Sequence, residues 1–200
     1  MKLLAFTDTH GSSKAINELA KRVKQDDPEA LICAGDVSIF ANNLKSILEK
    51  ISSLGKICFI IHGNHETETE MKAACSGFES IIFLHRKSAA FKHCIFLGWG
   101  GGGFSTTDKE FERFIPKFEK EIRSNPGKKV ILITHGPPYG TKLDKLIGGY
   151  CGSKSYRAFL EKNPVDLHIC GHIHENEDKH DKVGHARILN PGPFGKIVVI

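Results

Sequence analysis

Five short polar motifs, rich in aspartate, histidine and asparagine, are spread along this chain. They are Asp8-Thr9-His10, Gly35-Asp36, Gly63-Asn64-His65-Glu66, His135-Gly136-Pro137-Pro138 and Gly171-His172-Ile173-His174. Carboxylates and imidazoles are ligands for divalent metals, and the chain has 11 histidines in 200 residues. The candidate ligands are too many for one ion and suit two ions that share a carboxylate: Asp8, His10, Asp36, Asn64, His135, His172 and His174.

A two-metal site supports one kind of chemistry especially well. It clamps the attacking and leaving oxygens of a phosphoryl displacement and lowers the pKa of a bridging water. Asp8 and His10 are two residues apart, so in an extended segment their side chains share a face, and His172 and His174 repeat this spacing. Glycines beside the ligands permit tight turns and close approach of a substrate. We therefore expect hydrolysis of a phosphate ester.

Buried strands are the elements that must position these motifs. Short apolar runs precede all five motifs and predict strands at 2–7, 30–34, 56–61, 129–134 and 165–170. Ligands of open α/β sheets bind at the carboxyl ends of the strands. The five polar motifs are therefore expected to converge at one edge.

The remaining pattern predicts helices that alternate with the strands. Apolar residues at helical spacing indicate helices at 13–24, 42–53, 68–75, 107–123 and 153–162, with a kink or break at Pro116. Further strands are predicted at 80–84 and 89–97, paired antiparallel across a turn, and at 185–189 and 196–200. This order favours an α/β fold with mixed sheets in a single domain, residues 1–200.

Composition narrows the possible classes of protein. The chain is 40% hydrophobic and 26% charged, without an apolar run of the length of a membrane span. Its apolar start is too short for a signal peptide, so a cytoplasmic location is expected. The six cysteines form no Cys-x-x-Cys pair and are expected to be free thiols. The net charge of +5 is spread out, so neither nucleic acid nor a membrane is indicated as a partner.

In this order, the five motifs resemble the signature of the calcineurin-like metallophosphoesterase superfamily. His135-Gly136-Pro137-Pro138, Gly152-Ser153 and Cys170 to Glu175 are further similar to its small Icc-related predicted phosphoesterases. The resemblance implies a four-layer αββα sandwich of two mixed β-sheets. It also implies a dinuclear enzyme that hydrolyses a small phosphate ester, a phosphodiester or small nucleotide being favoured, by attack of a metal-bridging hydroxide. The two divalent ions would be Mn, Fe, Zn, Ni or Co.

The same resemblance implies a role for each ligand. One metal would be held by Asp8, His10 and His174, and the other by Asn64, His135 and His172. Asp36 would bridge the two ions. His65 would act with Asp36 in catalysis, stabilising the transition state or protonating the leaving oxygen.

Two other classes of protein remain as alternatives. A catalytically silent scaffold or binding protein on the same fold would show a broken ligand set, whereas this set is intact. A dinucleotide-binding oxidoreductase would use Gly98 to Gly103, which fits G-x-G-x-x-G, but His135 stands where its acidic residue is expected. We interpret this glycine run as a loop near the metals, with Trp99 or Phe104 as candidate substrate contacts.

Simpler roles also exist for single residues. An aspartate after a strand can cap a helix or form a turn, as Asp8 or Asp36 could if taken alone. Five histidines outside the motifs are expected on the surface or hydrogen-bonded in the core: His85, His93, His168, His180 and His185.

Overall fold

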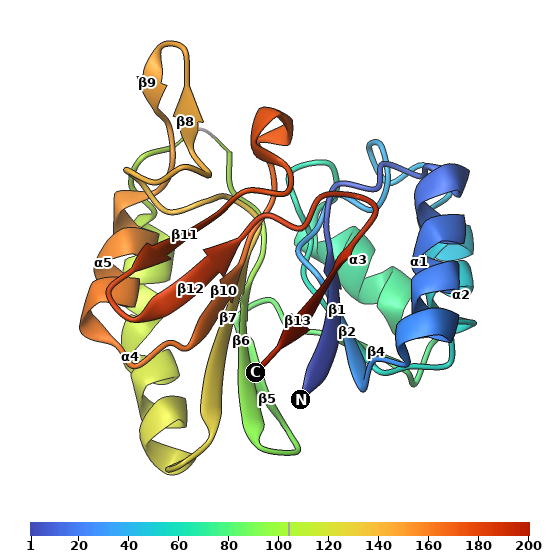
Figure 1. Cartoon of the computed structure of the whole chain (residues 1–200), viewed down its shortest axis with the longest axis horizontal. Coiled ribbons are helices and arrows are strands. Elements are labelled where there is room, and N and C mark those ends of the chain that lie inside the picture. Colours follow the sequence, from blue (N-terminus) through green and yellow to red (C-terminus); the bar gives the residue numbers. More distant parts are fainter. Residues whose placement is uncertain (104) are drawn as a thin grey trace.

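The computed structural model describes residues 1–103 and 105–200. Most of its strands belong to two large sheets that pack face to face (Figure 1). The first sheet has the strand order β13-β1-β2-β3-β4. Strands β1 to β4 run parallel, and β13 pairs antiparallel with β1. Their bounds are β1 Lys2–Phe6, β2 Ala30–Cys33, β3 Cys58–Ile60, β4 Ile81–Phe83 and β13 Lys196–Val199.

The second sheet has the order β11-β12-β10-β7-β6-β5. Strands β6, β7, β10 and β12 run parallel, whereas β5 and β11 are antiparallel edge strands. A separate two-stranded hairpin, β8 Lys145–Leu146 and β9 Gly149–Tyr150, projects from the molecule (Figure 1). The other bounds are β5 Lys87–Phe91, β6 Cys94–Trp99, β7 Lys129–Thr134, β10 Leu167–Ile169, β11 His180–Val183 and β12 Ala186–Leu189.

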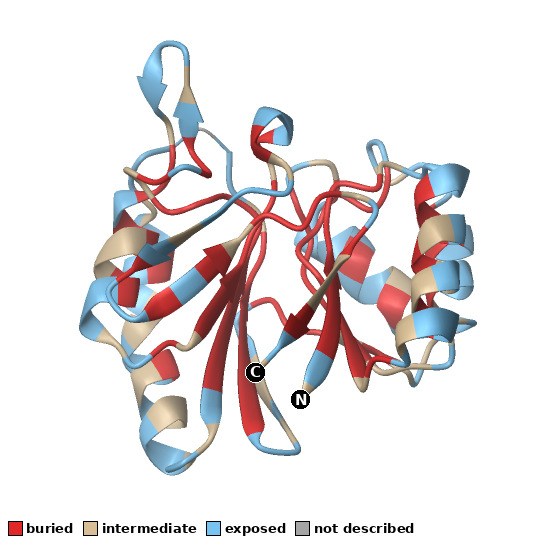
Figure 2. Ribbon diagram, in the orientation of Figure 1, coloured by how far each residue is buried: buried red, intermediate tan, exposed pale blue. Residues whose placement is uncertain are grey.

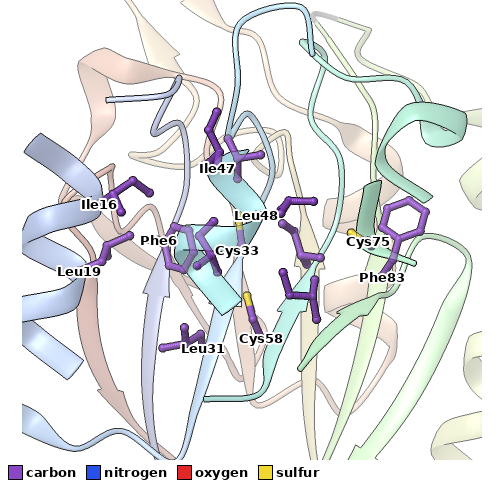
Figure 3. Packing of buried hydrophobic residues seen from close by; sticks show 14 of the residues in the cluster. Phe6, Ile16, Leu19, Leu31, Cys33, Ile47, Leu48, Cys58, Cys75 and Phe83 are labelled. Carbon is purple, nitrogen blue, oxygen red and sulfur yellow. The ribbon is translucent and has the colours of Figure 1, made fainter. Parts of the chain in front are cut away.

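Helices cover the outer face of each sheet. Helices α1 (Ser13–Asp26), α2 (Leu44–Ser52) and α3 (Glu68–Cys75) pack on the first sheet. Helices α4 (Lys109–Ser124) and α5 (Lys154–Lys162) pack on the second. Figure 3 shows the first of these outer cores, in which Phe6 and Leu31 meet Leu19 of α1 and Leu48 of α2. A short 3-10 turn, η1 (His174–Asn176), follows β10.

A third core lies between the two sheets. Leu3, Ile32 and Phe59 of the first sheet pack against Phe96 and Ile131 of the second. Burial is therefore concentrated in the strands and on the inner sides of the helices, as Figure 2 shows. Because alternate residues of a strand face opposite sides, each sheet contributes to two cores. The result is the expected four-layer αββα sandwich of two mixed sheets.

The middle of the chain differs from the prediction. The segments 80–84 and 89–97 do not pair with each other. Instead β4 joins the first sheet beside β3, and residues 87–99 form an antiparallel hairpin that belongs to the second sheet. Helix α4 also runs through Pro116 without a break.

In the described part of the chain, no helix combines the length and the apolar character needed to cross a membrane.

Candidate metal centre

The five polar motifs meet where the carboxyl ends of parallel strands from both sheets come together. Residues after β1, β2 and β3 come from one sheet, and residues after β7 and β10 come from the other. The imidazole of His135 joins the two sheets, because its Nδ1 lies 2.8 Å from the carbonyl oxygen of Ala34. A carbonyl can only accept, so Nδ1 carries the proton, and Nε2 points into the site. Metal-binding histidines are commonly oriented by a second hydrogen bond of this kind.

Asp8 is buried and its two carboxylate oxygens have different surroundings. Oδ2 accepts hydrogen bonds from the hydroxyl of Thr7 (2.9 Å) and the backbone N–H of His172 (3.0 Å). Oδ1 has no hydrogen-bond partner among the described residues. It lies 3.6 Å from Nε2 of His174 and 4.0 Å from Nε2 of both His10 and His135. One oxygen therefore anchors the side chain and the other faces three imidazoles.

Asp36 is arranged in the same way. Its Oδ1 accepts from the backbone N–H of His65 at 2.9 Å, and its Oδ2 lies 3.2 Å from Nε2 of His135. Burial alone would raise the pKa of Asp36, but its hydrogen bond and charge interaction with His135 lower that pKa to about 2. Burial would lower the pKa of His135, yet Asp36 and Asp8 raise it to about 9. Positive charge is thus strongly favoured between the two carboxylates.

His10 and His174 close one side of the site. Their Nε2 atoms are 3.2 Å apart, and Nδ1 of His10 lies 3.4 Å from the carbonyl oxygen of Ser38. His174 is exposed, and its interaction with Asp8 raises its pKa. Two ring nitrogens directed at the same carboxylate oxygen form a ready ligand set for a cation.

Asn64, His65 and His172 surround the other side. Oδ1 of Asn64 lies 2.9 Å from Nε2 of His135, and the ring of His172 contacts the same histidine edge to face, with centroids 5.1 Å apart. Burial and the nearby charge of His135 lower the pKa of His172 to about 4. His65 is half-buried, with its ring centroid 4.8 Å from that of His10. Every predicted site residue therefore lies in or against this one cluster.

Four predicted ligands have an unusual backbone conformation. Asp8, His10, Asp36 and His172 have positive φ values of 53°, 45°, 51° and 70°. Residues with a Cβ seldom adopt this left-handed conformation, which is often found at functional sites. The extended geometry expected for Asp8 and His10, and for His172 and His174, is therefore wrong, although both pairs reach the same site. Tight turns after the strands, rather than a shared strand face, bring these side chains together.

Glycines make room for the two carboxylates. A Cβ on Gly63 would lie 2.0 Å from Oδ1 of Asp36, and one on Gly171 would lie 2.3 Å from Oδ2 of Asp8. Neither glycine has a positive φ, so both are required here by space rather than by backbone conformation. The motif glycines therefore position the ligands as directly as the hydrogen bonds do.

Glu66 is a structural residue that the sequence reasoning missed. It is buried, and its carboxylate accepts from the backbone N–H and hydroxyl of Ser38 (2.8 and 2.7 Å) and from the backbone N–H of Gly63 (3.2 Å). It thereby ties the loop after β2 to the loop after β3. The signal was its place at the end of Gly63-Asn64-His65-Glu66, where a charged side chain follows two polar site residues.

The glycine-rich loop packs on buried histidines. A Cβ on Gly100 would lie 2.3 Å from Nδ1 of His62, and the N–H of Gly100 donates to Nδ1 of His85 at 2.8 Å. Of the five histidines expected on the surface or in the core, two are buried, His85 and His168, and three are exposed, His93, His180 and His185. Of the candidate substrate contacts, Trp99 is buried and donates to Asp108, and Phe104 lies outside the described residues.

The donor set fits divalent metal ions. Three groups of side chains bring their ligand atoms within 4.8 Å of one another: Asp8 with His10 and His174, His10 with Asp36 and His65, and Asp8 with Asp36 and His135. Mixed oxygen and nitrogen ligands suit Mn, Fe, Co, Ni and Zn. Oδ1 of Asp8, which has no hydrogen-bond partner among the described residues, belongs to the first group, and a cation held there would supply one.

Two facing mixed sheets carry, at their joined strand ends, an Asp/His cluster suited to divalent metal ions. The sequence model of the calcineurin-like phosphoesterases matches residues 1–176, and the chain belongs to this family. The predicted fold and the predicted enzyme class, a metal-dependent hydrolase of phosphate esters, are thus confirmed. No curated protein sequence matches the chain.

Solved structures with little sequence similarity share the fold. TT1561 of Thermus thermophilus has a TM-score of 0.78 at 13% identity, over 96% of this chain and 89% of that one. A dimetal phosphatase from Danio rerio has a TM-score of 0.68 at 9% identity, over 94% and 86%. A novel archaeal phosphodiesterase has a TM-score of 0.52 at 18% identity, over 96% and 84%. At such identities these likenesses establish the fold alone.

Proposed function

We propose that this phosphoesterase binds two divalent ions at the cluster described above. Asp8, His10 and His174 would hold one ion, and Asn64, His135 and His172 would hold the other. Asp36 would bridge them. The overlap of the ligand groups supports two neighbouring ions, since Asp8, His10 and Asp36 each belong to two of the three groups.

The observation that carries the proposal is the carboxylate of Asp8. A buried carboxylate oxygen without a hydrogen-bond partner is costly, and Oδ1 of Asp8 is in this position. Three imidazole Nε2 atoms lie within 4.0 Å of it. A cation among these groups would satisfy the oxygen and use the imidazole lone pairs at the same time.

Two bound ions would supply a water activated for attack and would neutralise charge on the phosphate. The chain's own residues would do the rest. His65 lies at the edge of the cluster, with its ring centroid 4.8 Å from that of His10 and its backbone N–H bonded to Asp36. Its imidazole would protonate the departing oxygen.

For the substrate, we infer a phosphodiester or a small nucleotide. A cavity of about 330 Å³ adjoins His172 and is lined by Gly102, Gly103, Ser153 and Tyr156. It borders the ligand cluster at His172 and would accept the second ester group of a diester, a group that a monoester lacks. We further infer that residues 1–200 form one domain in the cytoplasm. The inner core supports the first point, because Leu3 and Val198 share it.

The test is metal-dependent hydrolysis of bis(p-nitrophenyl) phosphate beside p-nitrophenyl phosphate, after metal is stripped and Mn²⁺ is added back. Wild type is compared with Asp36→Ala, His65→Ala and the control His93→Ala, which removes an exposed histidine. We expect diester turnover that needs metal, falls at least about 100-fold in the first two variants and is unchanged in the control.

Each other outcome changes a different part of the proposal. Preference for the monoester would keep the metal centre and overturn the substrate class. Full activity of Asp36→Ala would remove the bridging role. Two bound ions without turnover of either ester would point to a scaffold on the same fold.

A further inference from the structure

Phe40 is the most exposed large aromatic side chain in the described part of the chain, and it lies against the candidate metal centre. It is 73% exposed, whereas Tyr150 and Phe194 are 45% and 40% exposed. Its ring centroid is 4.8 Å from that of His65, with the planes inclined by 39°. Exposing a large aromatic surface to water is unfavourable, so its position beside a catalytic residue calls for a functional explanation.

The loop that carries Phe40 is anchored at its base. Glu66 accepts from the backbone N–H and hydroxyl of Ser38. The carbonyl of Val37 accepts from the hydroxyl of Thr9 at 3.1 Å and from the N–H of Gly11 at 2.7 Å. Phe40 is therefore held beside His65 by the two motifs that also carry His10 and Asn64.

Beyond this base the backbone is strained. Phe40, Ala41 and Asn43 have positive φ values of 48°, 57° and 55°. This conformation is disfavoured for residues with a Cβ, and for a bulky phenylalanine in particular. Strained residues that persist at the edge of a site indicate a functional demand. Here the strained turn keeps the ring at the surface next to His65, with most of its area uncovered.

We propose that Phe40 contacts the substrate and that an aromatic ring of the departing ester group packs on it. In a nucleotide substrate this ring is the nucleobase. The proposal rests on the proposed function, in which His65 protonates the departing oxygen. The group that leaves then lies on the His65 side of the site, where Phe40 presents its ring. A nucleobase stacks on such a ring with little dependence on its identity.

A simpler role would be that Phe40 only supports the imidazole of His65. That role needs one face of the ring and explains neither its exposure nor the neighbouring Ile39, which is 47% exposed. The two roles predict different ligand dependence. A support for His65 would affect every phosphate ligand alike, whereas a stacking surface affects ligands that carry an aromatic ring.

The test measures, by calorimetry, the binding of two ligands to the Mn²⁺-loaded protein. One is AMP, and the other is ribose 5-phosphate, which lacks the base. We expect wild type to prefer AMP. Phe40→Ala should weaken AMP binding roughly 5- to 150-fold, the value of one stacked base, and leave ribose 5-phosphate within about twofold. Phe40→Tyr should retain the preference, Phe40→Leu should lose most of it, and the control Ile147→Ala, at a fully exposed position, should match wild type.

Three results would overturn the inference. These are an equal loss for both ligands in Phe40→Ala, an unchanged AMP affinity in that variant, and a wild type that does not prefer AMP. Turnover of bis(p-nitrophenyl) phosphate is measured separately. A Phe40-dependent preference for AMP without turnover would support the stacking surface and refute the proposed function. Turnover without that preference would support the proposed function and refute the stacking surface.

Discussion

Replacing Gly63 by alanine is the smallest change that should disable the metal centre. The added Cβ would lie 2.0 Å from Oδ1, 2.6 Å from Cγ and 2.7 Å from the backbone nitrogen of Asp36. Rotation of the Asp36 side chain cannot relieve the contact with its backbone nitrogen. The φ of Gly63 is not positive, so alanine tolerates the backbone conformation and the change tests space alone.

The size of the effect follows from these distances. Ordinary contacts of a Cβ begin at 3.4 Å, so Asp36 or the loop after β3 must shift by more than one ångström. A displacement of about 1 Å at reacting groups can cost about 10²-fold in rate. Overpacking of a rigid site costs about 1–3 kcal/mol of folding stability. We therefore expect a fall of about 100-fold in kcat/KM together with weaker metal binding.

The assay measures kcat/KM for bis(p-nitrophenyl) phosphate, the number of bound Mn²⁺ ions, and urea unfolding of the metal-free protein. Gly77→Ala is the matched control, because no atom lies within 4 Å of its added Cβ and its φ is not positive. This control should keep full activity, with stability equal to wild type or up to about 1 kcal/mol higher.

A Gly63→Ala variant with wild-type kcat/KM and metal content would refute the reasoning. It would mean that the two loops can separate without disturbing Asp36, and that the position of this carboxylate is not fixed by close packing. Loss of activity with unchanged metal binding would instead indicate that the substitution displaces His65, whose N–H donates to Asp36.

Two further predictions concern the metals and a buried histidine. Chelation should lower the melting temperature of wild type but not of Asp36→Ala, since a ligand at 100 times its Kd stabilises the folded state by about 2.7 kcal/mol; equal shifts would contradict binding at this site. Burial lowers the pKa of His168 to about 3. Its contribution to the free energy of unfolding is therefore complete above its ordinary pKa of about 6.5 and is lost as pH falls towards 3. The loss is at most ~1.4 kcal/mol per pH unit. His168→Gln, which keeps a donor for Thr134, should lose less stability than wild type in urea titrations over that range, and an identical pH slope would refute the assignment.

The clustering of the candidate ligands could be predicted because its signals are local. Each candidate ligand follows an apolar run that becomes a buried strand, as with Asp8 after β1 and His135 after β7. Parallel strands bring their carboxyl ends to one edge, so convergence follows from strand order. The family resemblance added the expectation of two facing sheets, and in the structure the residues after β10 contact those after β1, where the N–H of His172 donates to Asp8.

The hairpin of β5 and β6 could not be predicted, because its turn lacks the usual sequence signal. Phe91 pairs with Cys94, leaving Lys92 and His93 as the turn residues, and Lys92 has a φ of 51°. Turns of this kind usually contain glycine, asparagine or aspartate. Without such a residue, the apolar run from 89 to 97 predicts one strand. The choice of partner for β4 was equally hidden, since an apolar strand fits either sheet.

The conformation of the ligands was hidden for a different reason. Spacing two residues apart predicts a shared face only if the segment is extended, and Asp8, His10 and His172 are left-handed instead. The cost of that conformation must be offset by the contacts it allows. Asp8 gains hydrogen bonds from Thr7 and His172, and the N–H of His10 donates to the carbonyl of Asp36 at 3.0 Å. These partners come largely from distant parts of the sequence, so no local pattern reports them.

The strained turns, the close glycines and Glu66 act together to fix the two carboxylates before any ion binds. Asp8 and Asp36 each have one oxygen committed to backbone donors and one directed at imidazoles. Such a site needs little rearrangement to accept metal, because its ligands are already oriented. It also holds like charges close together, which lowers stability until a cation or a proton enters. Asp36 and Asp8 accordingly raise the pKa of His135 to about 9 although burial acts in the opposite direction, so positive charge is favoured beside these carboxylates.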